Sequence, residues 1–177
     1  MKRIDCRRIS LLPLHHAQLQ MLLHSRAELE KSLGLTVSNI EVYSDFMPDF
    51  LGEFASALKE FIIPKVAENP ESYEWFTHWF IIHREENVTI GGIGASGLPD
   101  ENGSVTLGYF IDTKYEGRGF ATGAVECFKN WIFKNPNVKA IRADTPVEHF
   151  GSQKVLLKNG FQEYERDSEV VKWLLKR

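Results

Sequence analysis

A glycine-rich segment in the second half of the chain has the residue types of a phosphate-binding loop. It reads Tyr-Glu-Gly-Arg-Gly-Phe-Ala-Thr-Gly-Ala over residues 115–124 and follows an apolar run, Val105 to Ile111, that indicates a strand. Apolar residues then recur at helical spacing: Ala121, Ala124, Val125, Phe128, Trp131 and Ile132. A helix that begins at such a turn directs unpaired N–H groups and the positive end of its dipole outward, which favours phosphate. Gly117 and Gly119 have no Cβ to keep a pyrophosphate away from the main chain.

Two common nucleotide-binding motifs fit this loop poorly. A P-loop is excluded because no Gly-Lys-Ser/Thr closes the segment. A Rossmann turn has some support, since a second strand (138–143) ends in Asp144, where a ribose-binding acid would sit. The glycines, however, fall at positions 117, 119 and 123, so the third is one residue late. Four residues, 113–116, also separate the strand from the first glycine, whereas a dinucleotide fold turns at once.

A third interpretation matches in several places. The hexapeptide 116–121 resembles the Q/R-x-x-G-x-G/A signature of the GNAT superfamily of acetyl-CoA-dependent N-acyltransferases. A second block, His149-Phe150-Gly151-Ser152 followed by Val-Leu-Leu-Lys-Asn-Gly-Phe at 155–161, is similar to the N-x-x-S-x-x-x-x-x-K-x-G-F segment of the branch with the Rim-type ribosomal-protein N-terminal acetyltransferases. Residues 107–111 and 8–14 resemble two strands of that branch. The resemblance runs from about residue 8 to the last residue, with 26–75 unmatched.

This resemblance implies a fold and an activity. The fold is a mixed α/β GNAT fold: a central twisted, mostly antiparallel sheet of about seven strands, flanked by helices, with a splayed parallel strand pair that binds CoA. Residues 1–177 would form one acyltransferase domain. The activity is transfer of an acetyl group from acetyl-CoA to a primary amine, a peptide N-terminus or a small molecule, by direct attack in a ternary complex. The alternative is a non-catalytic GNAT-like module that binds acyl-CoA as a sensor or serves in protein interactions.

The resemblance also implies roles for individual residues. Cofactor binding falls to the loop and to the main chain of the preceding strand, that is to Gly117, Arg118, Gly119, Phe120, Ala121 and Thr122, with Phe110 and Ile111. His149 stands where relatives have an Asn that helps hold the cofactor, and it can still donate one hydrogen bond. Ser152 is the candidate catalytic acid, because Rim-type relatives use a serine at the matching position; a helix-turn hydroxyl bonded to a carbonyl is the structural alternative.

The chain also departs from the family pattern. Many relatives have a Tyr, the proton donor to the departing thiolate, where this chain has Leu156, and a Glu where it has Thr106. Glu116 replaces the first Gln or Arg of the signature. Two explanations fit these departures: the protein is inactive, or it uses different catalytic groups. The general base for the attacking amine is not identified. Glu148, Asp112, Glu41 and His78 are the candidates, and a water chain is the further alternative.

The acceptor side is the least informative part of the sequence. Family members build the acceptor pocket in the stretch that corresponds to Gly34–Phe54, which here carries acidic and aromatic residues: Glu41, Tyr43, Asp45, Phe46 and Asp49. These residues suit a cationic amine, although an acidic surface loop over buried aromatics has the same composition. Since an α-amine loses its proton more easily than a lysine side chain, we expect an α-amine acceptor.

Bulk properties are those of a small globular enzyme. The chain has 177 residues, 43% hydrophobic and 25% charged, and a net charge of −3, which argues against nucleic acid as a partner. No apolar run is long enough to cross a bilayer, so we expect a cytoplasmic protein without membrane contact; a homodimer stays open. Cys6 and Cys127 are expected to be two reduced thiols. We expect no metal, because His15, His16 and His24 lack cysteine or carboxylate partners at ligand spacing.

The remaining patterns predict the other elements. They indicate a strand over 4–11, one or two helices over 14–33, a loop over 38–48, a helix from Phe50 that Pro64 ends, strands over 75–83 and 88–95, and a final hairpin of 161–166 with 170–175. The last helix ends at Gly160 and begins either at the capping box Thr145–Glu148 or, as in the family, near His149.

Overall fold

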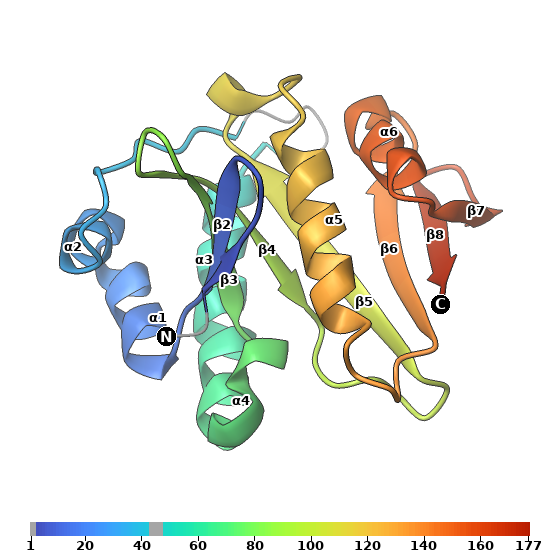
Figure 1. Ribbon diagram of the computed structural model, residues 1–177, viewed down its shortest axis with the longest axis horizontal. Helices are drawn as coiled ribbons and strands as arrows, with labels where there is room; N and C mark the ends of the chain where they lie inside the picture. The colour runs from blue at the N-terminus through green and yellow to red at the C-terminus, as the bar shows by residue number, and fades with distance from the viewer. Residues whose placement is uncertain (1–2, 43–47) are drawn as a thin grey trace.

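One mixed sheet of eight strands forms the centre of the protein (Figure 1), as seen in a computed structural model that describes residues 3–42 and 48–177. The strands are β1 (Ile4–Asp5), β2 (Ile9–Pro13), β3 (His78–His83), β4 (Val88–Ala95), β5 (Ser104–Ile111), β6 (Ala140–Pro146), β7 (Gln162–Arg166) and β8 (Val170–Lys176). Their order is β1-β2-β3-β4-β5-β6-β8-β7, and only β5 and β6 are parallel among these pairs. The expected mixed α/β fold, with its parallel pair, is confirmed.

Helices cover both faces of this sheet. They are α1 (His16–His24), α2 (Arg26–Ser32), α3 (Phe50–Ala57), the π-helical η1 (Leu58–Ile62), α4 (Ile63–Glu68), the 3-10 segments η2 (Pro70–Trp75) and η3 (Thr113–Tyr115), α5 (Phe120–Ile132) and α6 (Phe150–Lys158). In Figure 1, α5 crosses the front of the sheet and α6 lies beside it over β6 and β8. Helices α1 and α2, with η1 and α4, pack on the opposite face through a second apolar cluster.

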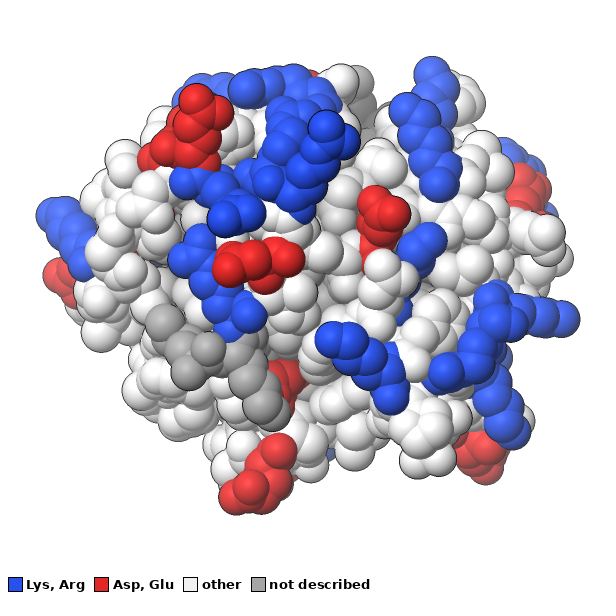
Figure 2. All heavy atoms as spheres, in the orientation of Figure 1, with Lys and Arg blue, Asp and Glu red and all other residues white. Residues whose placement is uncertain are grey.

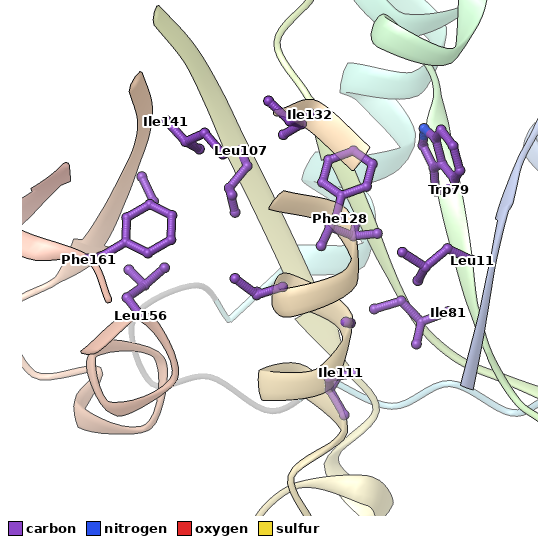
Figure 3. Packing of buried hydrophobic residues seen from close by; sticks show 14 of the residues in the cluster. Leu11, Trp79, Ile81, Leu107, Ile111, Phe128, Ile132, Ile141, Leu156 and Phe161 are labelled. Atoms are coloured by element: carbon purple, nitrogen blue, oxygen red, sulfur yellow. The ribbon is translucent and has the colours of Figure 1, made fainter. Parts of the chain in front are cut away.

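The two faces are separated by strand alternation. In β3, Trp79 and Ile81 belong to the cluster that packs on α5, whereas Phe80 and Ile82 belong to the cluster on the α1 side. Figure 3 shows Trp79, Ile81 and Phe128 of α5 close to one another on the first of these faces. A strand buried on both faces needs apolar residues at every position, which explains the unbroken run that predicted β3.

The parallel pair opens into a V. Strand β6 pairs with β5 only at Ser104–Thr106, opposite Ala140–Arg142. Beyond that point β5 continues along β4 to Ile111, and β6 continues along β8 to Pro146. The splay expected from the resemblance is therefore present, and the inner edges of both strands border a space that no strand of residues 3–42 and 48–177 fills.

Several predicted boundaries are wrong for local reasons. The strand expected over 4–11 is a hairpin, because a turn separates β1 from β2. Pro64 does not end its helix: the π-helical η1 precedes it, with Ile63 N–H bonded to Leu58 C=O, and Pro64 then occupies the first turn of α4, where its missing N–H is not needed. Trp75 closes η2 instead of opening β3. The capping box at Thr145 is absent because Thr145 and Pro146 still belong to β6.

The two cysteines correct another expectation. Cys6, in the β1–β2 turn, and Cys127, in α5, are joined in a disulfide with Cα atoms 6.4 Å apart. The expectation of two reduced thiols is wrong, because the hairpin that divides the first strand places Cys6 against α5 although 121 positions separate the two residues. The bond ties the first hairpin to the helix that follows the glycine loop.

Candidate active site

A cavity of about 410 Å³ lies where β5 and β6 separate, bordered by the glycine loop, the start of α5 and one side of α6. Nearly all of the residues expected at the site line it: Phe110, Ile111, Gly117, Gly119, Phe120, Ala121, Thr122, His149 and Ser152. Arg118 lies outside this lining and stacks its guanidinium over the rings of Tyr115 and Phe120. The fold thus brings the end of β5, the glycine loop and the start of α6, which are separate in the sequence, to one hollow.

The glycine loop has a backbone conformation that glycine favours. Gly117 and Gly119 have φ of 69° and 82°, in the left-handed region that favours glycine. A Cβ at either position would meet no atom within 4 Å, so both glycines face open space. Gly119 is the N-cap of α5 and makes no side-chain cap, which leaves the N–H groups of the first helical turn directed at the cavity. This arrangement can receive a phosphate, as the sequence predicts.

Basic side chains surround the loop. Arg8, from the β1–β2 turn, donates from Nη1 to the Arg118 carbonyl oxygen at 3.1 Å and lies 4.1 Å above the Phe120 ring. Arg84 donates to the Cys6 carbonyl oxygen on the same hairpin. Figure 2 shows Lys and Arg gathered at the top of this face, over the first hairpin and the segment before α5. Lys154 and Lys158 of α6 line the cavity from the other side, and the acidic Glu116 and Asp144 also line it.

Helix α6 is held against α5 by Asn159, which the sequence analysis did not single out. Its side-chain amide donates to the Thr122 carbonyl oxygen at 3.2 Å, and its own carbonyl accepts from Lys129 Nζ at 2.7 Å. Gln153 anchors the start of the same helix by donating to the carbonyls of Pro146 and Val147. These partly buried hydrogen bonds fix the two helices that border the cavity.

The free edge of β5 supplies main-chain donors. Asp112 N–H donates to Ile90 C=O, and Ser96 N–H donates to Thr106 C=O, so the even-numbered residues of β5 direct their main-chain groups at β4. Strand alternation therefore directs the N–H groups of Tyr109 and Ile111 toward β6 and the splay. Phe110 directs its N–H toward β4, and its side chain lies on the face of the sheet opposite α5.

Ser152 lies in the first turn of α6 beside Tyr109 of β5. Its Oγ is 2.7 Å from the Tyr109 hydroxyl oxygen, and that hydroxyl also donates to the Ser152 carbonyl oxygen at 3.2 Å. Burial raises the pKa of Tyr109 to about 12, although the hydrogen bond with Ser152 opposes the shift. Leu156, where many relatives have a tyrosine, is fully buried in the core near Phe161, as Figure 3 shows.

The four base candidates divide by environment. His78 is 5% exposed, and burial together with the charge of Arg26 lowers its pKa to about 3, so it stays neutral and is a very weak base. Asp112 caps η3 by accepting from the Lys114 N–H at 3.0 Å. Glu41 forms an ion pair with Lys114, and Glu148 is exposed in the segment that precedes α6 and does not line the cavity. None of the four lines the cavity.

A carboxylate that does line the cavity is Asp144. From the sequence alone, Asp144 is a candidate only for the ribose acid of a dinucleotide fold. In β6, Ile141 and Ala143 belong to the core on the α5 side, so alternation directs Arg142 and Asp144 to the other face, which Phe110 also occupies. The fold, not a local motif, makes this residue part of the site.

An aromatic group borders the cavity on that same face. The Phe110 ring contacts Phe50 and Phe54 of α3 with centroids 4.9 and 5.7 Å apart, and it stacks on the His78 imidazole at 5.8 Å. The imidazole occupies the space above Gly92, which a Cβ there would fill. We call Phe50, Phe54, Phe110 and His78 the aromatic wall. Tyr43, Asp45 and Phe46, expected on the acceptor side, lie outside the described residues; Asp49 directly precedes α3.

Two further kinds of site find no support in the described residues. None of their helices has the length and apolar composition needed to cross a bilayer. Residues 3–42 and 48–177 also contain no group of three or more His, Cys, Asp or Glu side chains placed to hold a metal ion.

Comparison with known proteins agrees with this geometry. The family described as acetyltransferase (GNAT) domain matches residues 26–162. An uncharacterized N-acetyltransferase, YjdG, from Bacillus subtilis (strain 168) is 30% identical over 99 residues, which are 56% of this chain and 59% of that relative's length. A second relative, the uncharacterized N-acetyltransferase p20 from Bacillus licheniformis, is 33% identical over 46% of each chain. The chain therefore spans about half the length of the curated relatives that it matches.

Solved structures share the whole fold at low identity. A ribosomal L7/L12 alpha-N-protein acetyltransferase, RimL, in complex with coenzyme A has a TM-score of 0.66 at 13% identity, covering 99% of this chain and 98% of that one. The ribosomal-protein-S5-alanine acetyltransferase from Vibrio fischeri has a TM-score of 0.65 at 16% identity, covering 99% and 97%. At these identities the likeness shows the fold alone.

Proposed function

The chain belongs to the GNAT acetyltransferase family, and from that premise we propose that it transfers the acetyl group of acetyl-CoA to a primary amine by direct attack in a ternary complex. One observation carries the proposal. A single cavity joins an open glycine cradle, the unpaired edge of β5 and a serine hydroxyl, so that a phosphate, an amide chain and a departing thiolate each meet a suitable partner.

The cofactor fits these residues by charge and by space. The first N–H groups of α5 and the two open glycines suit a pyrophosphate, and Lys154 and Lys158 add positive charge at the mouth. The edge of β5 offers the main chain of Tyr109 and Ile111 to the pantetheine amides, much as a peptide adds to a sheet. The Ile111 N–H is our candidate for polarising the thioester carbonyl. Arg118 acts through the loop, since its side chain packs on Tyr115 and Phe120.

Ser152 is our candidate for protonating the thiolate. If it has that role, Ser152→Ala lowers kcat while the affinity for acetyl-CoA stays nearly unchanged, because the hydroxyl is needed only as the C–S bond breaks. Calorimetry with CoA and single-turnover thiol release separate the two quantities. An unchanged kcat with chemistry rate-limiting makes Ser152 a helix residue and leaves solvent as the proton donor.

The acceptor that we propose is an α-amino group. Asp144 lies on the acceptor face and attracts a protonated amine, but no described carboxylate is buried in the cavity as a strong base. Since the reference pKa of an α-amine is near 8 and that of a lysine side chain about 10.4, the α-amine reaches its neutral form more readily. Two solved neighbours named for ribosomal proteins are consistent with a peptide N-terminus.

A peptide that carries a free α-amine and one lysine tests both levels of the proposal. We expect thiol release from acetyl-CoA and a product acetylated at the N-terminus by mass mapping. Acetylation of the lysine alone rejects the α-amine while the transferase stands. Tight CoA binding without acetylation of peptides, spermidine or other amines rejects the transferase and leaves the acyl-CoA sensor.

The compartment that we propose is the cytoplasm, where acetyl-CoA is available to such an enzyme. The Cys6–Cys127 disulfide weighs against this, because thiols there are kept reduced. Trapping thiols with an alkylating reagent in intact cells, followed by mass analysis, decides it: a fully oxidised pair rejects the cytoplasm.

A further inference from the structure

Tyr109 contacts the proposed acid from a different element. Its hydroxyl oxygen lies 2.7 Å from Ser152 Oγ and 3.2 Å from the Ser152 carbonyl oxygen, and both residues line the cavity. The ring packs against the core on the α5 side, so the hydroxyl has little freedom to move. The register of β5 with β4, where Tyr109 pairs with Ile93, fixes this position.

Two hydroxyl protons, one on Tyr109 and one on Ser152, share three acceptor oxygens. These are the phenol oxygen, Ser152 Oγ and the Ser152 carbonyl oxygen. When Tyr109 donates to its carbonyl partner, the Ser152 proton is directed at the phenol oxygen. When Tyr109 instead donates to Ser152 Oγ, the serine proton is free to point into the cavity. Because burial raises the Tyr109 pKa to about 12, the phenol remains a donor at neutral pH. In the second arrangement, the contact orients Ser152 as an acid toward the cavity.

We propose that Tyr109 is the positioning residue of Ser152 and supplies the proton that replaces the one Ser152 gives to the departing thiolate. The inference rests on the proposed transferase function. As the C–S bond breaks, sulfur keeps the electron pair and takes the Ser152 hydroxyl proton, and Ser152 Oγ takes the proton of the Tyr109 hydroxyl. The phenolate regains a proton from solvent, which has received the one lost by the attacking amine. The sum is amine plus acetyl-CoA to amide plus free thiol.

Acid strength favours this relay over Ser152 alone. A serine that loses its proton without replacement becomes an alkoxide, a much stronger base than a phenolate. With the relay, the charge moves from a thiolate, with a reference pKa near 8.5 for a thiol, to a phenolate of pKa about 12. The difference of about 3 to 4 pKa units is small enough for a transient state that solvent then neutralises.

The relay also accounts for the buried Leu156. The family tyrosine would project from the middle of α6, but in this chain that position is in the core and 0% exposed. Tyr109 brings a phenol to the same helix from β5, one turn nearer its start. A tyrosine and a serine are then both present at the cavity, although no local pattern in α6 reveals it.

A binding experiment tests the relay without an acceptor. Donors directed at the sulfur stabilise the thiolate of bound CoA and lower its pKa, which is measured from the ultraviolet absorbance of the thiolate as pH rises. We expect Tyr109→Phe to raise the pKa of the bound thiol by about one unit, which is a tenfold change in ionisation. The matched control is Tyr164→Phe, the same change at a residue 48% exposed on β7, and it should leave the thiol unchanged.

Ser152→Ala provides the second variant, since it breaks the contact from the helix side. It should raise the bound thiol pKa at least as far, and it should also raise the pKa of the Tyr109 phenol, which the Ser152 hydroxyl holds down. If either variant binds CoA normally with an unshifted thiol, the relay is rejected. This readout does not depend on transfer, so a wild type that binds CoA but acetylates nothing rejects the transferase and leaves the relay measurable.

Kinetics with the N-terminal peptide complete the test. Tyr109→Phe should lower kcat about tenfold with unchanged acetyl-CoA affinity, and adding it to Ser152→Ala should lower kcat no further. Full additivity of the two losses contradicts action through Ser152. A solvent isotope experiment adds a specific signature, because two protons in motion give a curved proton inventory in wild type and a linear one in Tyr109→Phe.

Discussion

Helices α5 and α3 border the same cavity from opposite faces of the sheet, yet they are packed very differently. Helix α5 buries Phe120, Ala124, Val125, Phe128 and Ile132 in the core. Helix α3 has no buried residue, and its Leu51 is 41% exposed. On the function that we propose, the cofactor side is built on a helix that the core holds in place, whereas the acceptor side is built on a helix that rests on the surface.

The largest expected effect breaks the cofactor side. Gly119→Val should weaken acetyl-CoA binding about a thousandfold, or about 4 kcal/mol, because the branched side chain fills the open space before α5 and disfavours the left-handed backbone. Calorimetry measures the loss. Gly34→Val is the matched control: Gly34 has a φ of 70° and equally open surroundings, but it follows α2 and lies outside the cavity. Equal affinity loss in both variants would mean that strain, not the cradle, is responsible.

The second effect concerns the disulfide that ties α5 to the first hairpin. Reducing the Cys6–Cys127 bond, which closes a loop spanning 121 positions, should lower the free energy of unfolding by about 3 kcal/mol. Urea unfolding with and without reductant measures it, and Cys6→Ser gives the same state without reagent. In the Cys6→Ser variant, added reductant should then have no effect; a further loss would show that the reductant acts elsewhere.

The contrast between the two sides also explains how much the sequence could predict. The glycine loop and the block around Ser152 are local patterns, and each is typical of one local structure. The sequence therefore predicted both the glycine turn before α5 and the helix that carries Ser152. Asp144, Tyr109 and Asn159 act through strand alternation or contacts between elements, which no local pattern encodes. The disulfide was missed for the same reason. The helix end predicted at Pro64 is wrong because the π-helical η1 places Pro64 in the first turn of α4, where a proline does not end the helix.

A third effect, which is smaller than the first two within any one pH unit, probes the aromatic wall. Folded protein keeps His78 neutral, with a pKa lowered to about 3 by burial and by the charge of Arg26, whereas an unfolded chain protonates it near pH 6.5. Between these values only the unfolded state gains a proton, so stability should fall as pH drops, by up to about 1.4 kcal/mol per pH unit. Urea unfolding at several pH values measures the slope. His78→Phe should flatten it, whereas His24→Phe, at an exposed position, should not.

The smallest effect decides whether the aromatic wall belongs to the acceptor at all. Phe50 lines the cavity, and its ring contacts Phe110 edge-on at 4.9 Å and Phe54 at 6.5 Å between centroids. Phe50→Ala removes both pairs, of which the closer one is worth about 1 kcal/mol. We expect the acceptor KM to rise about fivefold while acetyl-CoA affinity and kcat stay within twofold, because the ring contacts of Phe50 are with the aromatic wall, to Phe54 and Phe110. Phe61→Ala is the matched control, since Phe61 follows in the same helical run but is 66% exposed. Steady-state kinetics with the peptide, together with CoA calorimetry, separates the two sides. A loss of CoA affinity equal to the rise in acceptor KM would place Phe50 on the cofactor side, and the division between a core-held helix for the cofactor and a surface helix for the acceptor would be wrong.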